Sequence, residues 1–316
     1  ELAAVRILDP ACGSGNFLYV ALERLLELDK EVTAYAASNG LSGMLPVIST
    51  DQLLGLEINE YARELAQVVI WIGYLQWMIR NGYGYSIPVL SPLETIRLQD
   101  ALLDLSDPAH PKEAEWPEAD FIIGNPPFLG AKKLRKELGN DYSEALFKVF
   151  GAVVPGMSDL CCYFFELAHR AVESGSVERV GLLATNSIRG GKSRNVLDRI
   201  TGSGGIFHAW SDEPWFLDGA AVRISIIGFD NGSEMERVLD GQRVPQITSA
   251  LRYELDLSSA VLLSENAGIG FIGDVKGGKF DITATEARSL LNLPTNPNGR
   301  SNRDVLRPWF NTFDLV

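Results

Sequence analysis

The sequence predicts an α/β fold with helices packed on a mixed, mostly parallel sheet. Short apolar segments alternate with segments of helical periodicity between residues 5 and 229, which is typical of consecutive strand–helix units. Hydrophobic residues make up 46% of the 316 residues and charged residues 22%, and this balance supports a packed core. Beyond about residue 231, Gly, Asn, Pro and Ser become frequent. We therefore expect residues 1–235 to form the α/β domain and residues 236–316 to form a linker and a second region.

The strands are predicted from short apolar runs bounded by turn-forming residues. In chain order they cover residues 5–8, 51–58, 96–100, 121–123, 180–184 and 221–229, and the last is expected to pair with residues 206–210. Helical periodicity predicts helices over residues 17–30, 59–80 and 160–172. We expect Asn59 to cap the second helix and Ser158 or Asp159 to cap the third. Residues 31–50 are interpreted as an insertion, residues 231–265 as a boundary or linker, and Phe271-Ile272 as a short strand.

Composition argues against a membrane-spanning or disulfide-rich protein. The most apolar run, residues 68–79, is shorter than the roughly 20 residues that a membrane span needs. Three cysteines without a pairing pattern indicate a reducing, cytoplasmic setting. The net charge of −13 is unusual for a nucleic-acid binder, which normally carries a basic surface. Either a basic surface is local, or it belongs to a longer protein of which this chain is a piece, and the abrupt ends of the chain favour the second interpretation.

A glycine-rich turn joins the first strand to the first helix, and it reads Asp9-Pro10-Ala11-Cys12-Gly13-Ser14-Gly15-Asn16. Glycines let the backbone approach a ligand, and a helix N-terminus offers unpaired N–H groups. The turn matches neither the dinucleotide pattern G-x-G-x-x-G nor a P-loop. Asp9 would repel a phosphate but suits a cation, so S-adenosylmethionine, with its sulfonium and ammonium groups, fits better. The alternative is an ordinary tight connection in which the glycines serve packing.

The longer run from Asp9 to Leu18 resembles motif I of the adenine-specific DNA methyltransferases. The resemblance implies a Rossmann-like class I methyltransferase fold that binds S-adenosylmethionine, with Asp9, Gly13 and Gly15 along the methionine end of the cofactor. The cofactor-binding residues that it implies here are Asp9, Pro10, Ala11, Cys12, Gly13, Gly15, Asn16 and Phe17.

Two acids that follow later strands extend this resemblance. Glu57 lies at a strand end, where a carboxylate can accept hydrogen bonds from ribose hydroxyls, and Ile58 could pack on an adenine ring. The string Gly-Leu-Glu-Ile-Asn around Glu57 resembles motif II of the same family; the alternative is a solvated strand end. Asp100, followed by Ala101, falls where the family places an acid bonded to the adenine amine of the cofactor. The alternative for Asp100 is a helix N-cap.

The tetrapeptide Asn125-Pro126-Pro127-Phe128 carries the candidate catalytic residues. An adenine amine is a poor nucleophile because its lone pair is delocalised into the ring. The Asn125 side-chain oxygen and the rigidly held Pro126 carbonyl can accept its two N–H bonds, and Phe128 offers a face for a flipped base. The tetrapeptide resembles motif IV of N6-adenine and N4-cytosine methyltransferases, and its Phe and its place after motif I favour adenine. Protein-glutamine methyltransferases carry a similar tetrapeptide, so the substrate stays open.

Two basic clusters are expected near the substrate. From them we select Lys132, Lys133, Arg189, Lys192 and Arg194 as candidate ligands of DNA phosphates; the alternative is a pair of solvated loops. Residues 130–142 and 158–160 resemble the single-chain type IIL restriction–modification enzymes and related phage-defence methylases, in which a target-recognition domain follows the methyltransferase core. Residues 268–310 resemble the beginning of such a region, and no nuclease motif is present.

Together these resemblances imply a site-specific DNA methyltransferase that transfers a methyl group from S-adenosylmethionine to adenine N6. Its partner would be double-stranded DNA with a flipped adenine, in a restriction–modification or phage-defence system, and a parent chain could add recognition and nuclease domains. No metal and no membrane are expected. Two alternatives stay open: a protein-glutamine or RNA methyltransferase, and a non-catalytic DNA-recognition fragment.

Overall fold

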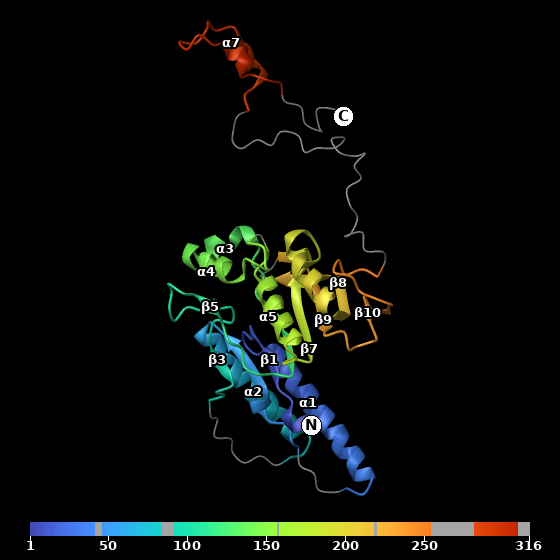
Figure 1. The fold of residues 1–316 in the computed structure, drawn as a ribbon. Coiled ribbons are helices and arrows are strands. Elements are labelled where there is room, and N and C mark those ends of the chain that lie inside the picture. The colour runs from blue at the N-terminus through green and yellow to red at the C-terminus, as the bar shows by residue number, and fades with distance from the viewer. Residues whose placement is uncertain (42–45, 84–91, 157, 218–219, 254–280, 309–316) are drawn as a thin grey trace. The chain divides into compact units, whose positions relative to one another are not determined.

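The computed structural model describes residues 1–41, 46–83, 92–156, 158–217, 220–253 and 281–308. The chain divides into two units, residues 1–259 and residues 260–316, each of which is described by itself (Figure 1). In the second unit, helix α7 (Ala284–Leu291) begins at a capping box formed by Thr283 and Glu286. The expected strand at residues 271–272 lies outside the described residues, as do residues 268–280 and 309–310 of the recognition-like region. The predicted boundary near residue 235 stays a prediction.

The first unit contains a mixed, mostly parallel sheet, as predicted. Within the described residues its nine strands lie in the order β11-β10-β8-β9-β7-β6-β1-β2-β3. β3, β2, β1, β6 and β7 run parallel to one another, whereas β9 runs antiparallel to β7 and β8. The strands are β1 (Ile7–Asp9), β2 (Leu53–Glu57), β3 (Ile96–Leu98), β6 (Phe121–Gly124), β7 (Arg179–Thr185), β8 (Gly205–Leu217), β9 (Ala220–Asp230), β10 (Val238–Leu239) and β11 (Gln242–Arg243); β4 (Leu103–Asp104) and β5 (Lys112–Glu113) form a separate pair.

Helices accompany this sheet in the first unit (Figure 1): α1 (Asn16–Ser38), α2 (Glu60–Arg80), α3 (Ala131–Leu138), α4 (Asn140–Phe150), α5 (Cys161–Glu173) and α6 (Asn195–Ser203). Asn59 caps α2 as predicted, since its Oδ1 accepts a hydrogen bond from Ala62 N at 3.0 Å. α5 begins one residue later than expected, so neither Ser158 nor Asp159 occupies its cap position. The Asp159 carboxylate nevertheless accepts a hydrogen bond from Cys161 N at 3.3 Å. None of the described helices is long and apolar enough to cross a membrane.

Two stretches that were interpreted as an insertion and a linker contain regular structure. α1 continues to Ser38, because residues 31–38 include three alanines and neither Gly nor Pro. Residues 238–243 form β10 and β11, and β10 pairs with β8 at the edge of the sheet. The turn between them is Asp240-Gly241, in which both residues have positive φ, a hairpin signal that the sequence contains. These elements were not predicted, whereas an insertion at residues 31–50 and a boundary within residues 231–265 stay predictions.

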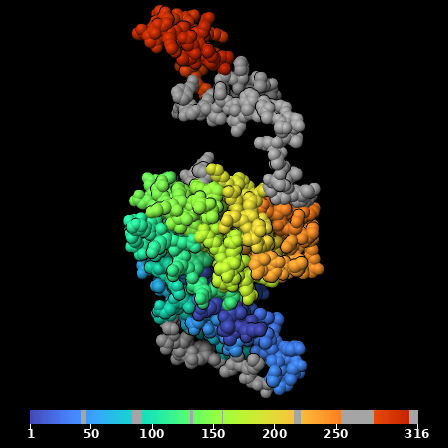
Figure 2. Space-filling view, viewed as in Figure 1, coloured from blue at the N-terminus to red at the C-terminus, as the bar shows by residue number. Residues whose placement is uncertain are grey.

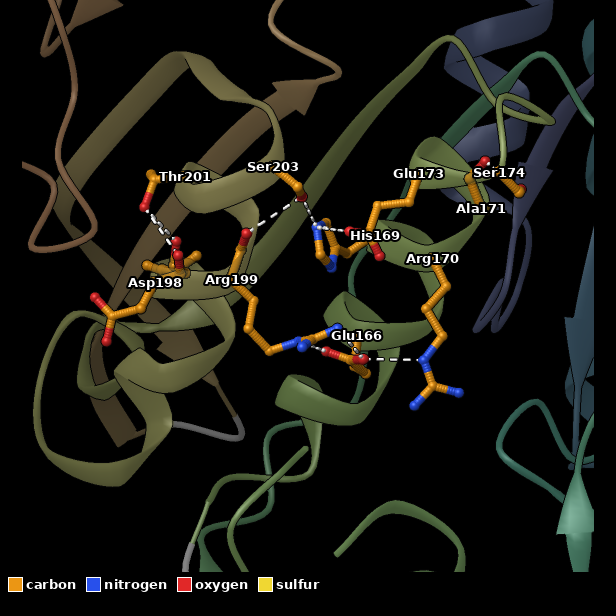
Figure 3. Close-up of polar contacts among 11 residues, drawn as sticks. Glu166, His169, Arg170, Ala171, Glu173, Ser174, Asp198, Arg199, Thr201 and Ser203 are labelled. Atoms are coloured by element: carbon orange, nitrogen blue, oxygen red, sulfur yellow. Dashed lines mark hydrogen bonds and ion pairs between the residues drawn. The ribbon is translucent and has the colours of Figure 1, made fainter. Parts of the chain in front are cut away.

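α5 is buried along most of its length, and a buried charge cluster ties it to α6 (Figure 3). Glu166 is fully buried, and its carboxylate accepts hydrogen bonds from Arg170 Nε at 2.9 Å and from Arg199 Nε at 3.0 Å. His169 Nε2 lies 2.7 Å from Ser203 Oγ in the same cluster. Because a buried carboxylate needs charged partners, the pair of Arg199 with Glu166 fixes α6 against α5, while Arg170 pairs with Glu166 within α5. The helix that begins beside the candidate site is thereby held in place.

Candidate active site

The predicted site residues gather along one edge of the sheet. β2, β1 and β6 are parallel neighbours, so their carboxyl ends bring Glu57, the glycine loop and Asn125 to the same edge. A cavity of about 840 Å³ opens there, within the usual size range of small-molecule sites. The predicted residues that line it are Pro10, Ala11, Glu57, Ile58, Asp100, Ala101, Asn125, Pro127, Phe128 and Lys133.

The glycine loop is held by hydrogen bonds from the neighbouring strand. Gly13 and Gly15 have φ angles of +54° and +82°, which glycine adopts without strain. Gly13 N donates to Glu57 Oε2 at 2.8 Å, and Cys12 N donates to Leu56 O at 3.0 Å. α1 begins directly after Gly15, so its first N–H groups have no partner within the helix. The predicted residues that belong to this loop or its surroundings but do not line the cavity are Asp9, Cys12, Gly13, Gly15, Asn16 and Phe17.

Asp9 is buried beneath this loop, with 1% of its surface exposed. Its Oδ1 accepts a hydrogen bond from Ala11 N at 3.0 Å. Burial, with a smaller contribution from the negative charge of Glu57, raises the pKa of Asp9 to about 7 against the lowering effect of the Ala11 hydrogen bond. A side chain at Gly124 would place its Cβ 2.5 Å from Asp9 Oδ1. The glycine before the tetrapeptide therefore makes room for the acid of the glycine loop.

The two other predicted acids are fixed by backbone N–H groups. Glu57 Oε2 holds the glycine loop, and its Oε1 accepts a hydrogen bond from Asn59 N at 2.8 Å. Asp100 Oδ1 accepts hydrogen bonds from Leu102 N at 2.7 Å and from Leu103 N at 3.2 Å. A carboxylate offers about four acceptor positions, so both acids keep acceptor capacity for a ligand in the cavity that they line.

Asn125 presents a buried acceptor without a partner. Its Oδ1 is inaccessible to solvent and makes no hydrogen bond within the described part of the chain, although a buried unpaired acceptor costs about 1–3 kcal/mol. The segment that follows is anchored to the start of α5. Leu129 N donates to Asp159 Oδ1 at 3.2 Å, and Leu160 N donates to Leu129 O at 3.0 Å. The downstream end of the tetrapeptide is thus anchored, and its unpaired acceptor belongs to a residue that lines the cavity.

The candidate phosphate ligands lie in different surroundings. Lys132 and Lys133 are in the first turn of α3, and Lys133 lines the cavity. Arg189 pairs with Asp212 at 3.4 Å, and Arg194 pairs with Asp198 at 3.3 Å. Lys192 is exposed in the short 3-10 turn at residues 191–194. The structure therefore brings one of these cations to the cavity and pairs two others with acids.

The cysteines take no visible part in the chemistry of the site. Cys12, Cys161 and Cys162 are buried free thiols, and burial followed by the charge of Asp9 raises the pKa of Cys12 above its usual value. Within the described ranges, His, Cys, Asp and Glu side chains form no group of three or more that could hold a metal ion.

Sequence reasoning missed several residues that line the cavity. They are Leu56, Gln99, Leu102, Leu129, Glu137, Leu138, Tyr142, Leu160 and Phe164. Those between residues 137 and 142 belong to α3 and α4, which were not predicted. Leu160 and Phe164 lie one turn apart at the start of α5. This spacing places them on one face of the helix, but the sequence does not distinguish that face because most of the helix is apolar.

Comparison with known proteins adds independent evidence. The family described as MmeI, DNA-methyltransferase domain, matches residues 1–240. DNA methyltransferase A of Bacillus subtilis (strain 168) is 28% identical over 243 residues, which cover 72% of this chain and 27% of that relative. A putative type II restriction enzyme and methyltransferase of Methanocaldococcus jannaschii is 34% identical over 84 residues, covering 24% of this chain and 6% of the relative.

A solved structure has the same fold. The type IIL restriction–modification enzyme MmeI in complex with DNA superimposes with a TM-score of 0.60 at 24% identity, covering 81% of this chain and 36% of that one. The chain thus spans between 6% and 36% of the lengths of the relatives named here.

Proposed function

The chain belongs to the family of MmeI DNA-methyltransferase domains, and from this premise we propose that it methylates adenine N6 in double-stranded DNA, using S-adenosylmethionine. The observation that carries the proposal is the buried, unpartnered Oδ1 of Asn125 in the wall of the cavity. The amine of a flipped base supplies the N–H donor that this atom lacks. The setting we infer is a restriction–modification or phage-defence system in the cytoplasm, where the three free thiols stay reduced.

The residues of the cavity wall and of the glycine loop beside it fit S-adenosylmethionine. The left-handed glycines permit close backbone approach, and the paired acids Asp9 and Glu57 favour a cation over a phosphate. When bound, the cofactor supplies an electrophilic methyl group on its sulfonium. We assign Glu57 to the ribose hydroxyls, through the acceptor positions that its backbone donors leave free. Asp100 is assigned to the adenine amine and Ile58 to the adenine ring, since both line the same cavity.

Asn125 and Pro126 are assigned to activate the target amine. The Asn125 Oδ1 accepts one N–H bond of the amine, and the Pro126 carbonyl accepts the other. These two acceptors shift the nitrogen toward a pyramidal form with a localised lone pair. The pyrrolidine ring fixes φ at Pro126, and the Leu129–Asp159 hydrogen bond anchors the downstream end of the segment. Phe128 provides the stacking face for the flipped base, and the amine loses its proton to solvent once it is alkylated.

Phosphate binding is assigned to the basic residues near the cavity. Lys132, Lys133 and Lys192 bind phosphates as simple cations. Arg189 and Arg194 exchange the carboxylates of Asp212 and Asp198 for phosphate oxygens. The match to a relative whose structure contains DNA supports a DNA partner.

Transfer of labelled methyl groups tests the proposal. The chain is incubated with labelled S-adenosylmethionine and unmethylated genomic DNA, and the product nucleosides are resolved. We expect N6-methyladenine from the wild type and from Asn39→Ala, an exposed control at the end of α1. Asn125→Ala is expected to lower the yield on the order of 100-fold, the usual cost of removing one polar contact to a reacting group. Label on cytosine, RNA or protein would contradict the substrate assignment. DNA retention without transfer by the wild type would indicate a recognition fragment.

A further inference from the structure

Helix α2 carries an apolar stripe on the face that it does not bury. Its buried face packs into the core through Ala66, Ile70 and Trp77. The other face carries six apolar residues that we call the α2 stripe: Tyr61, Leu65, Val68, Ile72, Leu75 and Ile79. Five of them are between 39% and 79% exposed, and Leu75 is partly buried. Soluble proteins rarely leave such a continuous apolar surface uncovered, so the stripe indicates an interaction surface.

The spacing of the α2 stripe fits a helix as its partner. Its residues follow one another at intervals of four, three, four, three and four, the heptad pattern with which two helices interlock their side chains. An extended partner would match a period of two instead. A hollow of about 320 Å³ lies along the stripe, and Val68, Ile72 and Leu75 line it together with Trp71 and Pro92. Side chains of an opposing helix have room to insert there.

The α2 stripe is complementary to itself. The intervals read the same from either end, so two antiparallel copies of α2 place every member of one stripe opposite a member of the other. The facing pairs are Tyr61 with Ile79, Leu65 with Leu75, and Val68 with Ile72. A two-fold dimer requires this property, because the same surface of both copies forms its interface.

Charges at the ends of α2 favour an antiparallel pair. Glu60 lies in the first turn of the helix and Arg80 in the last. The register that aligns the stripes also places Glu60 of one copy opposite Arg80 of the other, at both ends of the interface, whereas a parallel pair would oppose like charges. Arg80 lies 3.6 Å from Glu23 of its own chain, and both side chains are more than one third exposed. The guanidinium group can therefore bind a second carboxylate.

The exposed area is large enough for a dimer. Counting a fully exposed apolar side chain as roughly 150–200 Å², the five exposed members of the stripe present on the order of 500 Å² of surface. Two facing stripes therefore remove about 1,000 Å² from water, the lower limit of a specific interface. An interface of this size is expected to dissociate in the micromolar range.

We propose that α2 forms the interface of a two-fold dimer of this chain, in which the α2 stripes of two copies pack antiparallel. The two-fold axis passes midway between Val68 and Ile72. The inference is independent of the proposed function, since no member of the stripe lines the cavity.

Sedimentation velocity of the 316-residue chain tests the dimer at about 2–200 µM, a range that brackets micromolar dissociation. We expect the wild type to pass from monomer to dimer, and Val68→Glu to stay monomeric because a charge replaces the centre of the stripe. Val32→Glu is the matched control, since Val32 is 43% exposed and Val68 49%. Val32 lies in the C-terminal part of α1, whose blue surface projects at the lower end of the first unit in Figure 2. This control should dimerise like the wild type.

Disulfide trapping tests the register. The three native cysteines are buried, so introduced surface thiols react first. A mixture of Leu65→Cys and Leu75→Cys chains should cross-link on mild oxidation. Each variant alone should not, because like positions lie roughly 15 Å apart along an antiparallel pair, beyond the reach of a disulfide.

Three results would overturn the inference. They are a wild type that is monomeric over the whole range, a dimer that Val68→Glu leaves intact, and cross-links in each single variant but not in the mixture. The first would leave the α2 stripe to a helix of another protein or segment. The last would show a parallel pair.

Discussion

Replacing Gly124 by alanine measures how tightly the catalytic tetrapeptide packs against the glycine loop. The new Cβ would lie 2.5 Å from Asp9 Oδ1, whereas ordinary contacts begin at 3.4 Å. Asp9 is buried and its Oδ1 is held by Ala11 N, so the carboxylate has little freedom to move aside. Overpacking of this kind costs about 1–3 kcal/mol, and a weakened Ala11 hydrogen bond adds about 1 kcal/mol. We expect Gly124→Ala to lower the free energy of unfolding by about 2–4 kcal/mol.

The matched control is Gly181→Ala on the neighbouring strand β7. A Cβ at Gly181 meets no heavy atom within 4 Å, and both substitutions restrict the unfolded chain in the same way. The difference between the two variants therefore isolates the contact with Asp9. Urea unfolding followed by circular dichroism gives both free energies, provided that the slope with denaturant is unchanged. If Gly124→Ala proves as stable as Gly181→Ala, Asp9 is not held as described and the argument for its fixed position fails.

Three further predictions concern carboxylates that are buried or that accept more than one hydrogen bond. In the free chain, the free energy of unfolding should fall as pH rises from about 4 to about 7. The reason is that folded Asp9, with a pKa of about 7 against an ordinary value of 3.8, binds more protons in this range than unfolded Asp9. Urea unfolding at pH 5 and pH 8 should show that Asp9→Asn removes this dependence. Glu57→Gln leaves one carbonyl oxygen for two backbone donors, so calorimetry should find S-adenosylhomocysteine bound about tenfold more weakly, with the exposed Glu60→Gln unaffected. Glu166→Gln, which removes the charge between two guanidinium groups, should lower the free energy of unfolding by about 3 kcal/mol or more. Asp198→Asn at an exposed pair should change it by less than about 1 kcal/mol. Equal losses of unfolding free energy for the two variants in urea would contradict the burial argument.

The elements that could be predicted from the sequence are those with local signals. The strands that end at the glycine loop, at Glu57 and at the tetrapeptide are apolar runs that stop at turn-forming or acidic residues. The cap of α2 is likewise visible as an asparagine before an apolar helix. Because parallel strands end at a common edge, their order in the fold also predicts that these motifs meet.

The parts that escaped prediction depend on contacts between distant segments. α3 and α4 are short and separated only by Gly139, so their periodicity is too brief to recognise before the core that covers Leu134 and Leu146 is known. Tyr142 acquires its place in the wall of the cavity only through that packing. The two arginine ion pairs also differ in how far a sequence can predict them. The pair of Arg194 with Asp198 has the i,i+4 spacing that a sequence can suggest. The pair of Arg189 with Asp212 joins segments 23 residues apart.

The place of β1 between β2 and β6 in the sheet has a consequence for how the protein folds as it is made. The two neighbours of β1 are β2 and β6, and β6 ends only at Gly124, more than 100 residues after β1. At about 5–20 residues per second, the ribosome delivers that partner on the order of 5–25 seconds after β1. During this interval the apolar edge of β1 has no parallel partner on one side, and pairings between such distant segments form slowly. Substitutions in β6 should therefore reduce the yield of folded chain at elevated growth temperature more than equally destabilising substitutions on α2, whose contacts are complete earlier in synthesis.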